Sequence, residues 1–209
     1  MTSGARVPTV FVVDDDAAVR QSLVLLIRSM ALPVAAFESA QDFLERGDPA
    51  HPGCLVLDIR MPGMSGLELQ DELVRRDVSL PVIFITGHGD VAMAVRAMKS
   101  GAVDFIEKPF SDQVLLERIN RALEEDRARR QVREERAEIG RRVETLSPRE
   151  REVMERIVAG QANKVIAIEL GLSERTIEIH RAKVMTKTGA RSLAELVAMV
   201  TRLEAGGPR

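Results

Sequence analysis

The chain has no tryptophan and no tyrosine, and six phenylalanines are its only residues among Phe, Trp and Tyr. Unpaired nucleic acid bases stack on such side chains, and their scarcity argues against a single-stranded ligand. The single cysteine, Cys54, excludes an internal disulfide and is typical of a reducing compartment. No apolar run approaches the roughly 20 residues that cross a bilayer, and the first residues lack the apolar core of a signal peptide. These absences predict a cytoplasmic protein without a membrane partner.

A large excess of charge is absent as well, because the formal net charge is −2 in 209 residues. From Val143 to Arg209 there are 11 basic and 9 acidic residues, against 19 and 23 in the rest of the chain. This weak asymmetry permits DNA binding at the C-terminal end without establishing it. The length suffices for two small domains.

The most informative stretch is CLVLDIRMPGMSG, which begins at Cys54. Its first four residues form an apolar run that is typical of a strand buried on both faces, and this strand delivers Asp58 to its carboxyl end. Pro62, Gly63 and Gly66 delay the next helix, so Asp58 is expected on a rigid loop at the rim of a sheet. One such aspartate alone is more often a turn cap than a reactive group, and the other strand ends decide between the two.

The hydrophobic pattern predicts five strands that alternate with helices. This spacing indicates an α/β doubly wound five-stranded parallel sheet of flavodoxin-like order 2-1-3-4-5. The expected strands are Val10–Val13, Val34–Phe37, Cys54–Leu57, Pro81–Thr86 and Asp104–Ile106. The expected helices run from about Ala17 to Met30, from Ser39, from about Leu67 to Arg76, and from Asp90 to Gly101.

Polar residues follow four of these strands at the same edge of the sheet. Asp14 and Asp15 leave the first strand beside Asp58 from the third, and three carboxylates repel one another unless a cation joins them. Oxygen ligands without nearby His or Cys suit Mg²⁺, or Mn²⁺ in its place. Thr86 and Lys108 end the fourth and fifth strands and offer a hydroxyl and a positive charge. Four strand ends with this set of groups predict a phosphate-handling metal site.

Residues 8–124 resemble a CheY-like receiver domain of the two-component response regulators. The motifs VVDDD, LVLDIRMPGMSG, VIFIT and EKPF carry this resemblance. It implies that Asp58 is a nucleophile that takes a phosphoryl group from the phosphohistidine of a sensor histidine kinase in a Mg²⁺-dependent reaction. The protein would modify its own aspartate and would not be a turnover enzyme.

The same resemblance assigns roles to the residues around Asp58. It implies metal binding by Asp14, Asp15, Asp58 and the backbone carbonyl of Arg60. Further roles fall to three residues, which are Lys108 (neutralising phosphoryl charge), Thr86 (moving to the new phosphate oxygen) and Phe105 (the switch aromatic). The peptide bond between Lys108 and Pro109 is expected to be cis, and the glycine-rich loop at residues 87–89 is expected to rearrange.

A helical linker is predicted over residues 125–142. Arg and Glu dominate the sequence from Glu117 to Arg142, and their pairs at i,i+3 and i,i+4 favour one long helix that continues from the last receiver helix. A sparse apolar seam follows near-heptad spacing through Ala128, Val132, Ile139, Val143 and Leu146. A solvated spacer and a dimer contact both remain open for it.

Residues 143–204 predict a small all-α domain. Ser147 and Glu150 form a capping box before a first helix, Asn163–Leu170 is a second helix, and Ser173 caps a third that runs to about Lys187. Two short helices joined by a glycine-containing turn are a helix-turn-helix. Ser192 begins a second capping box and a fourth helix, whose inward residues are expected to be Leu196, Val197 and Val200.

The third helix of this domain has one inward and one outward face. At 100° per residue, Ile177, Val184 and Thr188 face the core. The outward face carries apolar residues among charges, which suits a DNA major groove. Base-contact candidates are Arg175, Glu178, Ile179 and Ala182. Phosphate-contact candidates are Asn163, Lys164, Thr176, His180, Arg181, Lys183 and Lys187.

These residues resemble the LuxR-type domain of the FixJ/NarL response regulators, through LSPREREVM, NKVIAIELGLSERTIEIHRAKVMTK and SLAELV. The segment TIEIHRAKVMTK is more similar to the FixJ branch of this family. The sequence departs from NarL, which has lysines at the positions of Glu178 and Ala182, so a different target sequence is expected. The resemblance implies promoter binding to double-stranded DNA, a homodimer on phosphorylation, and RNA polymerase as a partner.

Two other classes of protein fit parts of the sequence. VVDDD also reads as the D-x-D motif of a haloacid dehalogenase-type phosphatase, with Asp14 as nucleophile and Asp16 as acid/base. That class needs a further acidic pair after a later strand, whereas a helix is expected after Lys108. The other alternative is a regulator that acts by protein contact without DNA, against which the outward Ile179 and Ala182 argue.

Overall fold

The computed structural model describes residues 6–87 and 91–205. The chain divides after Arg129 into two compact units, which we call the N-terminal unit and the C-terminal unit. Within the described ranges, no helix is both long and apolar enough to cross a membrane. The two units are described separately.

The N-terminal unit is built on one five-stranded parallel sheet of order β2-β1-β3-β4-β5, as predicted. The strands are β1 Thr9–Val13, β2 Val34–Phe37, β3 Gly53–Asp58, β4 Val82–Thr86 and β5 Asp104–Glu107. In the register, Val13 pairs with both Phe37 and Leu57, and Asp58 pairs with Ile85. The carboxyl ends of β1, β3 and β4 therefore meet at one edge.

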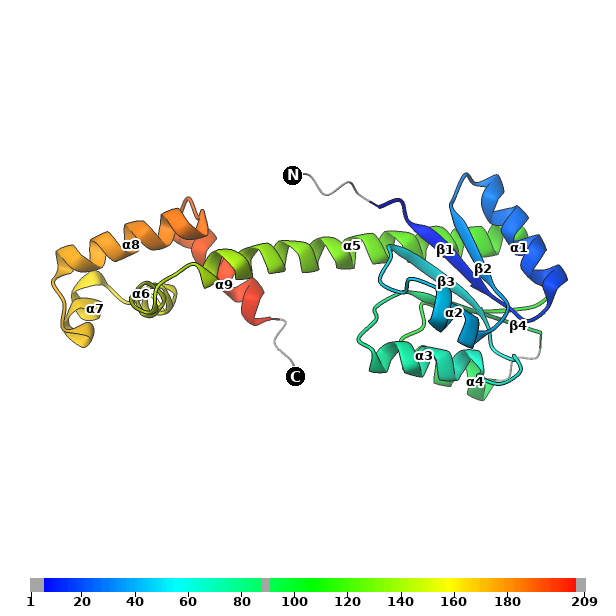
Figure 1. Ribbon diagram of the computed structural model, residues 1–209. Helices are drawn as coiled ribbons and strands as arrows, with labels where there is room; N and C mark the ends of the chain where they lie inside the picture. Colours follow the sequence, from blue (N-terminus) through cyan, green and yellow to red (C-terminus); the bar gives the residue numbers. More distant parts are fainter. Residues whose placement is uncertain (1–5, 88–90, 206–209) are drawn as a thin grey trace. The chain divides into compact units, whose positions relative to one another are not determined.

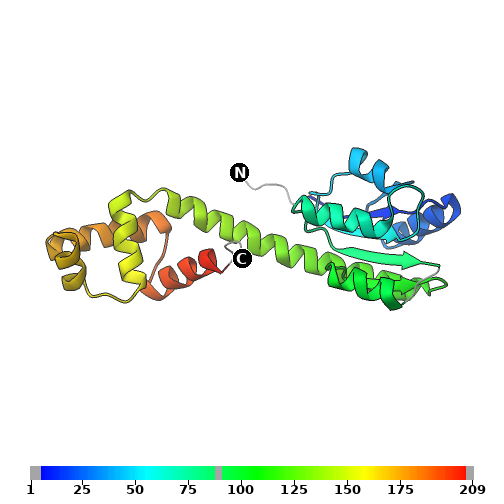
Figure 2. The same ribbon diagram turned by 90° about the horizontal axis from the view of Figure 1, so that it is seen from below.

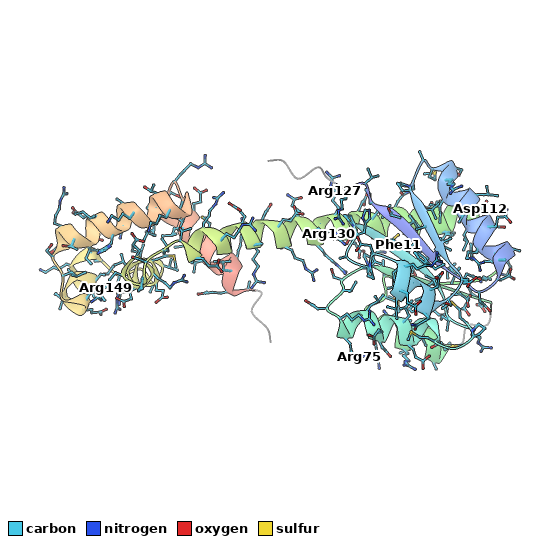
Figure 3. The ribbon with its side chains drawn as sticks, viewed as in Figure 1. Phe11, Arg75, Asp112, Arg127, Arg130 and Arg149 are labelled. Carbon is cyan, nitrogen blue, oxygen red and sulfur yellow. The ribbon has the colours of Figure 1, made fainter. Side chains whose placement is uncertain are left out.

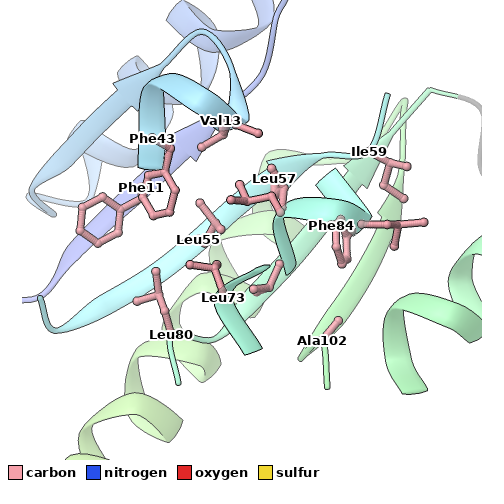
Figure 4. Packing of buried hydrophobic residues seen from close by; sticks show 14 of the residues in the cluster. Phe11, Val13, Phe43, Leu55, Leu57, Ile59, Leu73, Leu80, Phe84 and Ala102 are labelled. Atoms are coloured by element: carbon pink, nitrogen blue, oxygen red, sulfur yellow. The ribbon is translucent and has the colours of Figure 1, made fainter. Parts of the chain in front are cut away.

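Helices cover both faces of this sheet (Figures 1 and 2). They are α1 Ala17–Ser29, α2 Ala40–Arg46, α3 Gly66–Arg75, α4 Val91–Lys99 and the first part of α5 Asp112–Glu144. Leu23 and Ile27 of α1 pack with Leu115 and Ile119 of α5 on one face. The other face buries the cluster shown in Figure 4, where the rings of Phe11 and Phe43 lie 5.6 Å apart.

Capping residues fix where these helices begin. Asp16 caps α1, Ser39 caps α2, and Ser65 with Glu68 forms a capping box at α3. The helix expected from Asp90 is described from Val91 onward, and the expected rearranging loop lies outside the described residues except for Gly87. Exposed charged side chains project from the outer helix faces, as Arg75 on α3 and Arg149 do in Figure 3.

The C-terminal unit is all-α, as predicted. Its helices are the end of α5, α6 Pro148–Val158, α7 Asn163–Leu170, α8 Glu174–Thr188 and α9 Leu193–Glu204. Gly171 has φ 65° and ends α7 in the left-handed conformation that the tight turn into α8 requires. Ile177, Val184 and Thr188 are fully buried, so the predicted inward face of α8 is confirmed.

Two details at the start and the core face of α9 differ from the prediction. The side chain of Ser192 accepts from the backbone of Glu195, but the Glu195 carboxylate bonds to the amide of Arg191, one residue before the cap. Only half of a capping box is therefore present. Met199 is buried beside Leu196 and Val200, whereas Val197 is half-buried. The face of α9 that packs on the core therefore includes Met199 in place of the expected Val197.

α5 is one helix of 33 residues, as the Arg and Glu pattern predicted. The apolar seam, which runs along α5 and ends beyond it at Leu146, does not behave as one surface. Val132 is 64% exposed, whereas Ile139, Val143 and Leu146 are buried in the core of the C-terminal unit. Both hypotheses for the seam are therefore wrong for these three residues, because their own chain covers them.

Candidate functional site

Three polar side chains are buried at the carboxyl edge of the sheet. Asp14 directly follows β1, Asp58 ends β3 and Thr86 ends β4, with exposed fractions of 1%, 6% and 1%. Their strands are neighbours, so the three groups converge as predicted. Burial of two acids in one place is costly unless a cation accompanies them.

Lys108 supplies a positive charge between the two acids. Its Nζ donates to Asp14 Oδ2 and to Asp58 Oδ1, each at 2.9 Å. The remaining oxygens accept from backbone amides: Asp14 Oδ1 from Asp16 at 2.9 Å, and Asp58 Oδ2 from Arg60 at 2.7 Å. Each carboxylate is therefore fixed by the backbone on one side and by Lys108 on the other.

The electrostatics of this group favour an additional cation. Burial raises the pKa of Asp14, and the bonds and charge of Lys108 offset this only in part. Burial also lowers the pKa of Lys108, but its bonds and charges with Asp58 and Asp14 outweigh that effect, and the pKa is raised overall. Two carboxylates and one ammonium leave one negative charge, and this balance suits a divalent cation.

The expected cluster of three acids is not formed. Asp15 is exposed, and among residues 6–87 and 91–205 no group of three or more Asp, Glu, His or Cys side chains is close enough to hold a metal. Successive residues of an extended segment point in opposite directions, so Asp14 turns inward and Asp15 outward. Asp14 and Asp58 fit a Mg²⁺ site by their chemistry, whereas Asp15 would have to reorient to join them.

Asp16 has a structural role at the start of α1. Its Oδ1 accepts from the amides of Ala18 at 2.8 Å and Val19 at 3.2 Å, which makes it the N-cap. A carboxylate held in this way is engaged with backbone amides of α1. The phosphatase alternative loses its second catalytic residue here.

The loop after β3 holds Asp58 through a close backbone contact. The amide of Gly66 donates to the carbonyl of Ile59 at 3.0 Å. A Cβ on Gly66 would lie 2.3 Å from the carbonyl oxygen of Asp58, so only glycine fits at this start of α3. The glycine of the motif therefore determines how near the start of α3 comes to Asp58 at the end of β3.

The fifth strand end also has the predicted form. The peptide bond between Lys108 and Pro109 is cis, and the amide of Lys108 donates to the carbonyl of Thr86 at 2.7 Å. Phe105 is half-buried and packs against the core cluster of Figure 4. The sequence analysis did not single out Arg20, whose Nη1 donates to the carbonyl of Asp14 at 2.7 Å. Its position as a basic residue near the start of the helix after β1 could have indicated this contact.

The candidate DNA-reading face of α8 is exposed. Arg175, Glu178, Ile179 and Ala182 all face solvent, and Ile179 is 46% exposed. Arg175 Nη1 lies 3.2 Å from Glu178 Oε2, so these two candidates form an ion pair with each other. An exposed isoleucine within a charged face is the feature that the sequence predicted.

The phosphate-contact candidates differ in exposure and in bonding. Lys164 and Lys183 are exposed, whereas Thr176 and His180 are half-buried. Four candidates bond within the unit, and one of them is Thr176, whose Oγ1 lies 2.8 Å from Ser173 Oγ. Arg181 Nη1 donates to Asn163 Oδ1 at 3.0 Å, and Lys187 Nζ donates to Glu150 Oε2 at 2.6 Å and to the carbonyl of Thr145 at 3.1 Å.

Comparison with known families identifies both units. The response regulator receiver domain matches residues 10–120, and the luxR family of bacterial regulatory proteins matches residues 144–200. The chain therefore belongs to the response regulators that join a receiver domain to a LuxR-type DNA-binding domain. As a family these are signalling and transcription factors, and the two domains imply a kinase partner and DNA binding. Receiver domains generally bind Mg²⁺ at the phosphorylation site.

Within this class the chain is similar to FixJ-type regulators. It is 53% identical to nodulation protein W of Bradyrhizobium diazoefficiens over 91% of this chain and 84% of that protein. It is 50% identical to the transcriptional regulatory protein FixJ of Azorhizobium caulinodans, over 91% of this chain and 90% of that protein. The solved structure of the response regulator StyR has 48% identity and a TM-score of 0.85, and covers 93% of this chain and 98% of that one. The predicted FixJ/NarL membership, with FixJ relatives, is confirmed.

Proposed function

We propose that the protein is a phosphorylation-controlled transcription regulator in which Asp58 accepts a phosphoryl group from a sensor histidine kinase. The supporting observation is the pair of buried carboxylates, Asp14 and Asp58, that share the ammonium group of Lys108 at 2.9 Å. Burial keeps water away from Asp58, and its backbone bond to Arg60 fixes the direction of the carboxylate.

In the proposed reaction, an oxygen of Asp58 forms a bond to phosphorus while the phosphorus–nitrogen bond of the kinase phosphohistidine breaks. The electron pair of that bond stays on the imidazole nitrogen. Lys108 neutralises the negative charge that gathers on the transferring group, because its Nζ already lies at Asp58 Oδ1.

Asp14 and Asp58, with Asp15 after reorientation and the backbone carbonyl of Arg60, are the groups that would hold Mg²⁺. When bound, this ion supplies further neutralisation of phosphoryl charge. Its affinity depends on the ionised form of Asp14, whose pKa is raised by burial. Arg20, which donates to the carbonyl of Asp14, keeps the backbone of this ligand in place.

Thr86 is the proposed sensor of the modified aspartate. It ends β4, and the strand pairing places its neighbour Ile85 opposite Asp58. A phosphoryl oxygen on Asp58 attracts the Thr86 hydroxyl, and the half-buried Phe105 on β5 occupies the space that Thr86 leaves.

The proposed output surface is an apolar stripe on α4. Val91, Val95 and Met98 lie at i, i+4 and i+7, with exposed fractions of 81%, 46% and 48%. Such a stripe on a solvated helix suits contact with the same stripe of a second copy. We propose that phosphorylation favours this receiver dimer.

The dimer delivers two helix-turn-helix units to paired half-sites on promoter DNA. Arg175, Glu178, Ile179 and Ala182 are the proposed base contacts. The proposed phosphate contacts are Asn163, Lys164, Thr176, His180, Arg181 and Lys183. RNA polymerase is the proposed partner of the bound dimer.

One experiment tests the phosphorylation control and the sequence-specific DNA binding together. Duplexes that the full-length protein enriches from a random pool are compared with and without acetyl phosphate and Mg²⁺. We expect a single enriched motif with two half-sites, bound more tightly when the phosphoryl donor is present. Equal affinity with and without donor contradicts the phosphorylation control, and the absence of any enriched motif contradicts sequence-specific DNA binding.

A further inference from the structure

The last turn of α8 is attached to the segment where α5 ends and α6 begins, residues 142–150, which we call the α5–α6 junction. Lys187 Nζ donates to Glu150 Oε2 at 2.6 Å and to the carbonyl of Thr145 at 3.1 Å. An ammonium group has three protons, so two of them are used inside the unit. The Lys187 side chain is thereby directed to the junction, although its residue was expected to face DNA.

Glu150 requires this partner. Its side chain is 6% exposed, and the same Oε2 that meets Lys187 accepts from the amide of Ser147 at 2.8 Å. A buried carboxylate without a cation is strongly destabilising. The bond from Lys187, followed by those from Ser147, lowers the pKa of Glu150 to about 2. With Lys187 as its partner, Glu150 is therefore ionised throughout the physiological range.

A second cation of the junction meets the end of α8. Arg142 Nη1 donates to the carbonyl of Thr188 at 3.4 Å. A Cβ on the following Gly189 would lie 3.1 Å from the same Nη1, so the guanidinium group fills the space beside the helix terminus. A positive charge at this place also complements the negative end of the helix dipole. The two contacts run in opposite directions, because α8 donates hydrogen bonds through Lys187 and accepts one through the carbonyl of Thr188.

We infer that Lys187 is a positioning residue, which with Glu150 and Arg142 fixes the C-terminal turn of α8 to the α5–α6 junction, and that it does not contact a DNA phosphate. This inference rests on the proposed DNA-binding function. It removes one cation from the phosphate-contact candidates and makes it a determinant of how α8 is oriented. Glu178 and Ala182 lie on the preceding turns of the same helix, so their reach into a groove depends on this attachment.

Lys183 offers a matched control, because it is the same residue type, one turn earlier on α8, and exposed like Lys187, but its side chain has no bond to another described residue. The full-length protein is titrated on a duplex that it enriched from a random pool and on a scrambled duplex, over a range of salt concentrations. For Lys183→Met we expect the slope of log K against log salt to fall by about 0.9, with the preference for the enriched duplex retained.

For Lys187→Met we expect the salt slope to stay unchanged and the preference for the enriched duplex to fall roughly fivefold or more. A protein that is merely less stable loses active molecules without changing this ratio. Lys187→Arg keeps the charge and alters the geometry, so it too is expected to lose preference. A Lys187→Met variant with a slope reduced by about 0.9 and an unchanged preference overturns the inference.

A double-mutant cycle without DNA separates this inference from the proposed function. Thermal unfolding of the C-terminal unit is measured in the full-length protein for Glu150→Gln, for Lys187→Met and for both together. We expect each single change to lower the melting temperature, and the double variant to resemble the single ones. Additive effects overturn the inference. Failure of the unchanged protein to bind any duplex would overturn the DNA-binding function and leave this cycle informative.

Discussion

Lys108 Nζ lies 2.9 Å from Asp58 Oδ1 and, on its other side, 2.9 Å from Asp14 Oδ2. One ammonium group thus holds together the proposed phosphoacceptor and the acid proposed to bind the metal, although 94 residues separate Lys108 from Asp14. A phosphoryl group on Asp58 would compete for this same ammonium. The arrangement makes the carboxylate pair sensitive to covalent change at one oxygen, and the first predictions concern this pair.

Asp58→Asn is expected to abolish labelling by acetyl phosphate, because an amide nitrogen cannot replace the carboxylate oxygen as the nucleophile. The measurement is the mass of the intact protein after incubation with donor and Mg²⁺. Asp71→Asn is the matched control: Asp71 is an acid of the same unit that pairs at the surface with Arg96, so its variant should label normally. Undiminished labelling of the Asp58 variant would assign the nucleophile to another acid.

Asp14→Asn is expected to stabilise the N-terminal unit at pH 7 in buffer without divalent ions. Burial raises the pKa of Asp14 above its ordinary value of 3.8, so ionisation is costlier in the folded chain than in the unfolded one. The favourable contribution of the protonated form is complete below about 3.8 and is lost as the pH rises through the folded-state pKa. Asparagine imitates the protonated form at every pH.

Thermal unfolding across pH 4–7 measures this effect, and the advantage of the variant should shrink as the pH falls. Added Mg²⁺ should raise the melting temperature of the unchanged protein and leave that of Asp14→Asn nearly constant, because only the former keeps the acid that binds the ion. A variant that is less stable than the unchanged protein at pH 7 would contradict the assigned cost of burying Asp14.

Asp16→Ala is expected to cost about 1 kcal/mol of stability, because two amides at the start of α1 lose their acceptor. Labelling of Asp58 should persist, since Asp16 takes no part in the proposed transfer. Chemical denaturation and intact mass measure the two properties on one sample. Loss of labelling from a folded Asp16→Ala protein would show that Asp16 takes part in the transfer and is more than a helix cap.

Val95→Glu is expected to keep the labelled protein monomeric, because a carboxylate in the centre of the α4 stripe would be buried without a partner in the dimer. Light scattering after chromatography gives the mass of the labelled protein. Leu25→Glu on α1 is the control, since Leu25 is another exposed apolar residue of the same unit, at 63% exposure. A labelled Val95→Glu protein that still dimerises would place the contact on another surface.

The sequence predicted those features that depend on local pattern. Apolar runs predict the buried strands that lead to Asp14, Asp58 and Thr86, and the parallel order brings their carboxyl ends together. The sequence also predicted the capping box of Ser147 and Glu150. The sequence did not predict the direction of the Asp15 side chain, because that direction depends on the backbone conformation after β1.

Contacts between distant residues also escaped prediction. The buried carboxylate of Asp126 on α5 accepts a hydrogen bond from the amide of Gly53 at 2.9 Å, and 73 positions separate the two residues in the sequence. No sequence motif predicts such a pair. The pairing of Lys187 with Glu150 is hidden in the same way, because an isolated lysine on a helix is read as solvated or as a ligand contact. Heptad-like spacing misled the interpretation of Ile139, because intramolecular burial and dimer contact produce the same periodicity.

Glu178→Ala and Lys183→Ala are expected to change DNA binding in different ways. Both side chains are exposed on the outward face of α8, but a carboxylate can accept from a cytosine amino group, whereas an ammonium group neutralises phosphate charge. Removal of Glu178 should relax the preference at one base position, by about 1–3 kcal/mol of discrimination, and also release Arg175 from its ion pair. Removal of Lys183 should weaken all sequences alike and reduce the salt slope by about 1. Binding of each variant to a panel of single-base changes in the enriched duplex measures both effects, and a uniform loss of affinity in both variants would show that the reading face lies elsewhere on the unit.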